Sequence, residues 1–205
     1  GLLLVARAAH GRIPVTAWFA VPLVYGHPLH YGFVNFALGV ALALLAFALW
    51  IELGARGMTR RRWLIFAPIG VVLWICHIMG LAVFCILAGA DVLLREWGRR
   101  RSWLSALALT ALAMLPLAAG PALGLLFGDG AAPATLFEYR HASRKLLWLA
   151  ETLRDRWQLW DIASSLFLIA VAAGLWRSDK FELDRGLAAG ALLLLLAFAL
   201  SPEII

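Results

Sequence analysis

The segment Tyr31–Trp50 constrains the fold of this chain more than any other part of the sequence. Its 20 residues, YGFVNFALGVALALLAFALW, contain no charged side chain. A helix needs about 20 apolar residues to cross a hydrocarbon core of about 30 Å. In lipid, such a segment must also satisfy its backbone hydrogen bonds internally, as a helix does. The segment therefore predicts a membrane-spanning helix and an integral membrane protein.

The composition supports this class of protein and argues against a nucleic-acid partner. Hydrophobic residues make up 63% of the chain and charged residues 15%, whereas soluble domains are about 25% charged. The net charge of +6 comes from short clusters between apolar runs: Arg60–Arg62, Arg99–Arg101, and Arg140 with Arg144 and Lys145. Such clusters are typical of the flanks of membrane spans. They form no continuous basic face that would bind nucleic acid.

Successive apolar runs predict an all-α fold, a polytopic transmembrane helical bundle. Spans are expected at residues 33–53, 63–90, 103–127, 159–176 and 187–205. Residues 13–28 form a weaker or kinked span, because this run is short and contains Pro14 and Pro22. The chain begins and ends within apolar runs, which suggests a fragment of a longer polytopic protein with a truncated last span.

Residues 139–158 have a different pattern from the spans. Apolar residues recur every three or four positions, at Leu146, Leu149, Leu153 and Trp157. The other face carries charged residues, among them Arg144, Lys145, Glu151 and Arg154. A basic face opposite a Trp-bearing apolar face predicts an amphipathic helix in the membrane interface. The alternative is a solvated helix that caps the bundle.

The loops do not fix the orientation of the predicted bundle. Two consecutive loops carry four arginines each: Arg56, Arg60, Arg61 and Arg62, then Arg95, Arg99, Arg100 and Arg101. If the run 63–90 between them crosses once, these loops lie on opposite sides of the membrane. The positive-inside rule then gives no preference.

A group of polar and aromatic residues precedes the first strong span: His27, His30, Tyr31 and Asn35. His27 and His30 have HxxH spacing, but metal sites usually need three or four ligands. No Asp, Glu or Cys is close in sequence, so we predict no metal and no cofactor. An aromatic belt with a proline turn is the favoured interpretation. The alternative is a pocket for a headgroup or sugar. Asn35 would either bind such a ligand or form a hydrogen bond within a helix contact made by small residues.

Three ionisable residues share one face of the predicted span 63–90 and its extension: His77, Asp91 and Arg95. His77 is expected near the bilayer midplane and directed into the bundle, because ionisable groups at that depth usually face protein or a water cavity. The alternative is a neutral histidine that hydrogen-bonds an adjacent helix. Asp91 and Arg95 are four residues apart with the acid first, the favourable order for an ion pair.

Lys145 and Asp161 lie on either side of the amphipathic segment and are further candidates. They would bind an anionic headgroup and orient a neighbouring cation. No GxSxG, P-loop, HExxH or CxxC motif is present, so no residue is assigned a catalytic role.

Three elements resemble bacterial polytopic membrane proteins grouped with the GT-C-type, lipid-linked-sugar glycosyltransferases. They are Tyr31–Gly39 (YGFVNFALG), His77–Gly80 (HIMG) and the segment from Lys145 to Asp161. The resemblance implies a multi-helix bundle in the bacterial inner membrane and sugar transfer from a polyprenyl-phosphate donor. It also implies base and metal-binding carboxylates in an early extramembrane loop. No such acidic motif is present here, so it lies upstream of Gly1 or the chain is a non-catalytic relative.

Two other functions fit the same sequence. A transporter would place His77 and the Asp91–Arg95 pair on a solute or proton path, although transporters often contain internal repeats and none is evident. A non-enzymatic membrane assembly protein is the third alternative. In all three cases the expected partners include membrane lipids.

Overall fold

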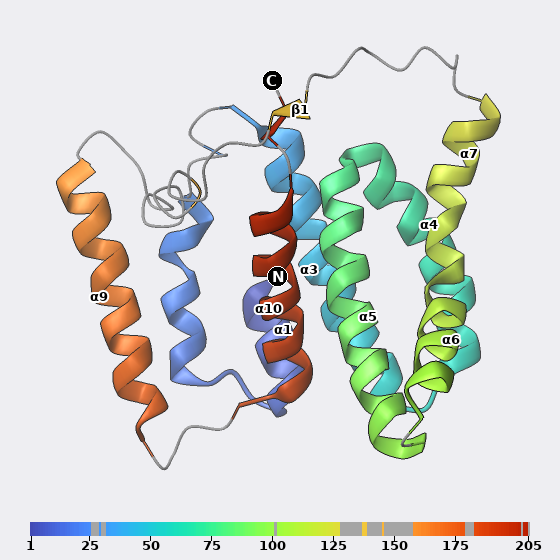
Figure 1. Ribbon diagram of the computed structural model, residues 1–205, viewed down its shortest axis with the longest axis horizontal. Coiled ribbons are helices and arrows are strands. Elements are labelled where there is room, and N and C mark those ends of the chain that lie inside the picture. Colours follow the sequence, from blue (N-terminus) through green and yellow to red (C-terminus); the bar gives the residue numbers. More distant parts are fainter. Residues whose placement is uncertain are drawn as a thin grey trace.

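The computed structural model describes residues 1–25, 29, 32–100, 102–127, 137–138, 145, 158–178, 183–201 and 203–204. The fold is all-α, which confirms the predicted fold class (Figure 1). The helices are α1 (Leu2–His10), α3 (Val34–Ala55), α4 (Thr59–Cys76), α5 (Ile78–Arg100), α6 (Trp103–Met114), α7 (Ala119–Phe127), α9 (Gln158–Trp176) and α10 (Arg185–Leu200). The described residues also include three short 3₁₀ helices, η1 (Val15–Ala20), η2 (Pro22–Tyr25) and η3 (Leu115–Ala118).

Within the described part of the chain, four helical segments are long and apolar enough to cross a membrane. They are Val34–Ala55, Ile78–Arg100, Trp103–Phe127 and Leu159–Trp176. The third consists of α6, η3 and α7, and Pro116 lies in the 3₁₀ turn. Because proline lacks a backbone N–H, a local 3₁₀ turn at this point keeps the helical rod continuous. α10 is apolar but shorter, at 16 residues.

The single span predicted over residues 63–90 is instead two helices joined at His77. α4 ends at Cys76, α5 begins at Ile78, and His77 is extended, with φ −174° and ψ 130°. Arg62, near the start of α4, contacts Trp50 near the end of α3, whereas His77 lies against Gly39 near the start of α3. The chain therefore reverses at His77, and α4 runs antiparallel to both α3 and α5.

This hairpin places chain segments from distant parts of the sequence at two common ends. α3 and α5 end, and α4, α6 and α10 begin, at what we call the arginine-rich end, at the bottom of Figure 1. α3 and α5 begin, and α4, α7 and α10 end, at what we call the opposite end. β1 (Phe137–Glu138) and β2 (Glu203–Ile204) form a two-residue antiparallel pair there. α9 stands at the edge of the bundle, with little of its surface buried.

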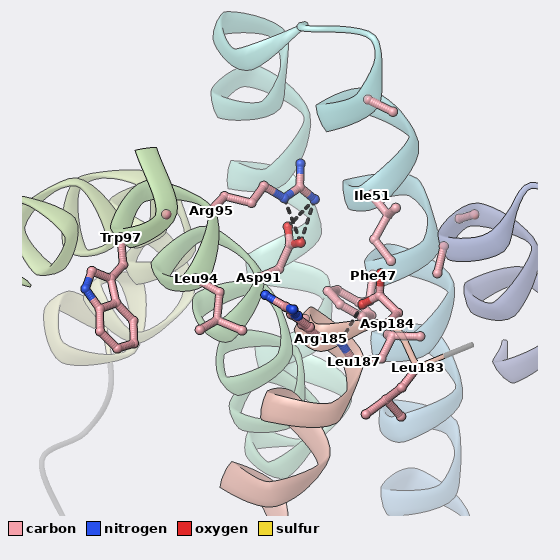
Figure 2. A pocket seen from close by; sticks show the side chains of 15 residues that line it. Phe47, Ile51, Asp91, Leu94, Arg95, Trp97, Leu183, Asp184, Arg185 and Leu187 are labelled. Atoms are coloured by element: carbon pink, nitrogen blue, oxygen red, sulfur yellow. Dashed lines mark hydrogen bonds and ion pairs between the residues drawn. The ribbon is translucent and has the colours of Figure 1, made fainter. Parts of the chain in front are cut away.

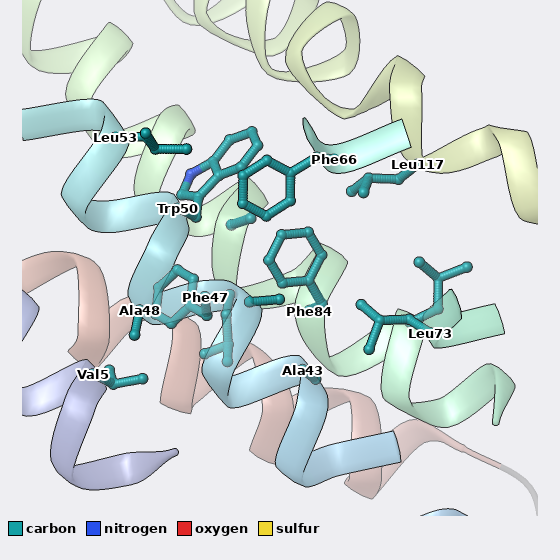
Figure 3. Close-up of a cluster of buried hydrophobic side chains, with 14 residues drawn as sticks. Val5, Ala43, Phe47, Ala48, Trp50, Leu53, Phe66, Leu73, Phe84 and Leu117 are labelled. Carbon is teal, nitrogen blue, oxygen red and sulfur yellow. The ribbon is translucent and has the colours of Figure 1, made fainter. Parts of the chain in front are cut away.

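The core is an aromatic cluster where α3, α4 and α5 meet (Figure 3). Trp50, Phe66 and Phe84 are at most 2% exposed. Trp50 packs edge-on against Phe66 at 4.9 Å and Phe84 at 5.9 Å, and the two phenylalanines stack at 5.4 Å. Such pairs contribute roughly 0.5–1.5 kcal/mol each beyond the area that they bury. In lipid, where apolar surface alone does not drive association, this packing holds the hairpin on α3.

The predicted contact of small residues on α3 is present only in part. Gly39, Ala43 and Ala46 are buried against the hairpin, but Asn35, one helical turn earlier, is exposed. Because the first turn of α3 projects beyond this contact, Asn35 does not form the buried cross-helix hydrogen bond that its pattern suggests.

Two predicted segments have a different outcome. The part of residues 13–28 that the structure describes forms η1 and η2, with mostly exposed side chains, instead of one continuous helix. The amphipathic helix predicted over 139–158 lies outside the described residues, except for Lys145 and the backbone of Gln158.

Candidate functional site

A pocket of about 820 Å³ opens at the arginine-rich end, between α1, α3, α5 and the start of α10 (Figure 2). Its walls are apolar on the α3 side, where Phe47 and Ile51 line it. Four charged residues also line it: Asp91, Arg95, Asp184 and Arg185. The combination of apolar and charged lining suits an amphiphilic ligand.

Asp91 and Arg95 form the ion pair that their spacing predicts. Arg95 Nε donates to Asp91 Oδ1 at 2.9 Å, and Nη2 donates to Oδ2 at 2.6 Å. The Asp91 side chain is 11% exposed and the Arg95 side chain 43%. A two-pronged guanidinium–carboxylate contact holds both groups in a fixed orientation at the wall of the pocket, and the remaining nitrogen of Arg95, Nη1, lies beside Gly54.

A second guanidinium lies behind this pair and is not evident from the sequence pattern. Arg62 is 7% exposed, donates from Nη2 to the Trp50 carbonyl, and places Cζ 4.2 Å from the centroid of the Trp50 ring. Its Nε has no hydrogen-bond partner among the described residues. The helical phase of α4 provides a signal for this burial, because Arg62 precedes buried Phe66 by one turn.

Gly54 makes room for both guanidinium groups. A Cβ at this position would lie 1.7 Å from Arg62 Nη2 and 3.1 Å from Arg95 Nη1. Two cations therefore lie close together beside the single carboxylate of Asp91. The other carboxylate of the pocket, Asp184, accepts from Leu187 N at 2.8 Å and caps α10. With Arg62 counted behind the pocket wall, three arginines (Arg62, Arg95 and Arg185) outnumber these two carboxylates by one.

His77 lies at the opposite end instead of near the midplane of a span. Its carbonyl accepts from Gly80 N, and its Nδ1 accepts from Met79 N at 3.1 Å. These are the contacts of a helix N-cap, here for α5. Its ring meets Phe36 edge-on at 5.5 Å, so it faces α3. Fourteen residues of α5 separate it from Asp91, about 21 Å at 1.5 Å per residue.

The other predicted residues do not join the pocket. Lys145 is buried and donates from Nζ to the carbonyls of Phe198, Ala199 and Ser201, which engages it as a cap of α10. Asp161 is buried on the first turn of α9. His27, His30 and Tyr31 lie outside the described residues.

No group of three or more His, Cys, Asp or Glu side chains within the described ranges is arranged to hold a metal ion. Comparisons of the chain with protein-family models, with curated proteins and with solved structures find no match.

Proposed function

We propose that the chain is an integral membrane protein that binds the phosphate-bearing head of a lipid in the pocket beside Asp91 and Arg95. The carrying observation is the excess of guanidinium groups there: Arg95 lines the pocket, and Arg62, which does not line it, lies behind Arg95 beside the same carboxylate. The planar guanidinium matches phosphate oxygens through paired hydrogen bonds. Arg185, exposed at the start of α10, is the third cation and lines the pocket.

The position of the pocket supports a lipid ligand over a soluble anion. It lies where α3 and α5 end, which is the level of headgroups if these helices cross the membrane. Phe47, Ile51 and Leu187 line its apolar part. An acyl or prenyl chain would contact these side chains while its phosphate meets the arginines.

The finer proposal is that the ligand is a polyprenyl-phosphate carrier of sugar in a bacterial inner membrane, as the GT-C resemblance implies. Glycosyl transfer also needs a carboxylate free to act as a base. Asp91 is held by Arg95 and Asp184 caps α10, so the pocket is suited to holding a donor. On this proposal, a base would come from outside the pocket.

A transport function has less support. His77 and the Asp91–Arg95 pair lie near opposite ends of α5, and the described stretch of α5 between them contains no Asp, Glu, Lys or Arg. A proton or solute path would need further polar groups between the two sites.

Thermal unfolding of the purified chain in detergent tests the proposal. We expect a short-chain polyprenyl phosphate to raise the unfolding midpoint and the matching polyprenol, which lacks the phosphate, to leave it unchanged. Phosphatidic acid as a third probe distinguishes a general phosphate-headgroup site from one that selects the prenyl chain.

The matched variants are Arg185→Gln and Arg99→Gln. Arg185 lines the pocket, whereas Arg99, also exposed, pairs with Glu96 outside it. Loss of one charge-assisted contact should weaken phosphate binding roughly tenfold in Arg185→Gln and leave Arg99→Gln unchanged. Equal stabilisation by polyprenol and polyprenyl phosphate, or equal binding by the two variants, would rule the proposal out.

A further inference from the structure

The reversal at His77 changes where the arginine-rich loops lie. A single crossing between them would separate them, but α4 returns the chain before α5 begins. Gly54 provides the geometric evidence, because a Cβ there would meet Arg62 from α4 and Arg95 from α5 together. The loops after α3 and after α5 therefore lie at the same end of the bundle.

α4 makes this return through the bundle, although it is not one of the four segments that are long and apolar enough to cross a membrane. Its 18 residues extend about 27 Å at 1.5 Å per residue, and residues 63–76 carry no charge. α3 and α5 run in the same direction, so the chain between them must traverse the bundle once more. Arg62, at the start of α4, keeps its charged end beside the arginine-rich end.

The remaining loops at this end are also basic. α1 ends there and is followed by Arg12, Arg177 follows α9, and Arg185 is the first residue of α10 (Figure 1). Every arginine that the structure describes belongs to this end. At the opposite end, the described Lys145 is engaged with the C-terminus of α10.

The full sequence shows the same asymmetry. Of the 18 lysines and arginines, five lie in the segment between α7 and α9, which joins helices at the opposite end. The other 13 are within or next to the helix ends and connections of the arginine-rich end. Basic residues in short loops are retained on the cytoplasmic side.

We infer that the arginine-rich end lies on the cytoplasmic side of the membrane and that the pocket opens toward lipids of the cytoplasmic leaflet. The exposed arginines then face the leaflet that carries the anionic headgroups. This orientation follows from the hairpin and the loop charges, and it holds whichever ligand the pocket binds.

Thiol labelling of single-cysteine variants tests the orientation. The background is the full chain with Cys76→Ala and Cys85→Ala. Arg61→Cys reports the start of α4, and Gly98→Cys, where an added Cβ meets no atom within 4 Å, reports the end of α5. Phe127→Cys, at a residue that is 80% exposed at the end of α7, reports the opposite end.

A membrane-impermeant maleimide should label Phe127→Cys in intact spheroplasts, and the other two only in inverted vesicles. Labelling in denaturant verifies that each variant is present, and Arg99→Cys replaces Gly98→Cys if the latter does not accumulate. Labelling of both Arg61→Cys and Gly98→Cys from outside would show that the arginine-rich end lies outside the cell and would overturn the inferred orientation. Labelling of these two positions from different sides would show that the hairpin does not cross the membrane twice.

Discussion

Gly39 and Gly80 bring the backbones of α3 and α5 into contact. A Cβ on Gly80 would lie 2.7 Å from the carbonyl carbon and oxygen of Gly39. Small residues allow such close approach in lipid, where dispersion contacts replace the hydrophobic effect as the force between helices. The contact lies next to His77, so it fixes the point at which the hairpin packs on α3.

Gly80→Ala should therefore destabilise the bundle. The obstructing atoms are backbone, so the two helices must separate, at a cost of about 1–3 kcal/mol. Denaturant unfolding in detergent, followed by circular dichroism, measures the change. Gly89→Ala is the control on the same helix, because its Cβ would meet only Thr110 Cγ2, at 3.9 Å. Equal losses in both variants would show that the Gly39–Gly80 contact is not what limits stability.

Replacing His77 should loosen the start of α5. His77→Ala removes the Nδ1 acceptor for Met79 N and should cost about 0.5–2 kcal/mol. His77→Asn should recover part of this, because asparagine is a good N-cap. Hydrogen exchange at the first amides of α5 measures the effect locally, with His10→Ala as the distant control. Equally fast exchange in the Ala and Asn variants would contradict the capping role.

The sequence predicts well those features that depend on local spacing. The uncharged run within Tyr31–Trp50 becomes most of α3, and the four-residue spacing of Asp91 and Arg95 produces the ion pair. Both follow from the rise and the period of the α-helix. The class of fold is predictable for the same reason, because apolar length alone requires helices in lipid.

The reversal at His77 is not predictable from local pattern. The segment Cys76–Gly80, CHIMG, contains no proline and has its only glycine after the turn. One signal is available in the length of the run: the 28 uncharged residues 63–90 would extend about 42 Å as one helix, well beyond a hydrocarbon core of about 30 Å. Folded at His77, the same run gives two limbs of about 20 Å each, with Arg62 and Asp91 at the same end.

The pocket escaped prediction because it joins residues from distant parts of the sequence. Asp91 and Arg95 are recognisable as a pair, but Arg62 reaches them only through the hairpin, and Arg185 only because α10 packs on α5. Gly54 gives no sign of its role until both guanidinium groups are placed. Long-range packing determines this site, and the spacing of residues along the sequence does not predict such packing.

A double-mutant cycle on Asp91 and Arg95 should reveal a coupling of roughly 1 kcal/mol, because Asp91 is buried while partial exposure of Arg95 screens the pair. Asp91→Asn alone should be the more harmful single change, since it leaves Arg62 and Arg95 adjacent without a counter-charge. Unfolding free energies of the two single variants and the double variant give the coupling. The control pair is Glu96 and Arg100, also four residues apart on α5, with 3.3 Å between Oε2 and Nε.

That control pair is more exposed and should show coupling near zero. A coupling for Asp91 and Arg95 as small as that of the control would mean that the buried carboxylate does not hold Arg95 in place. Arg95 would then not be preorganised at the wall of the pocket.

Lys145 binds the C-terminal end of α10, although it lies more than 50 positions earlier in the chain. It supplies donors to the last carbonyls of the helix, which have no partner within it. Lys145→Met should therefore cost about 1–3 kcal/mol, because the carbonyls of Phe198 and Ala199 lose a charged donor. Hydrogen exchange of the terminal turn of α10 should accelerate, since Ser201 N donates to Ala197 O in that turn.

Two variants decide whether this effect is specific. Lys145→Arg retains a cation with several donors and should preserve most of the protection. Arg177→Met removes an exposed cation after α9 and should leave α10 unchanged. If Lys145→Met left exchange at the end of α10 as slow as in the unaltered chain, the lysine would not stabilise this terminus. The contact between Lys145 and α10 lies at the opposite end of the bundle from the pocket. Its loss should therefore leave the phosphate affinity of the pocket unchanged. An unchanged affinity would distinguish a local capping role from a general loss of structure.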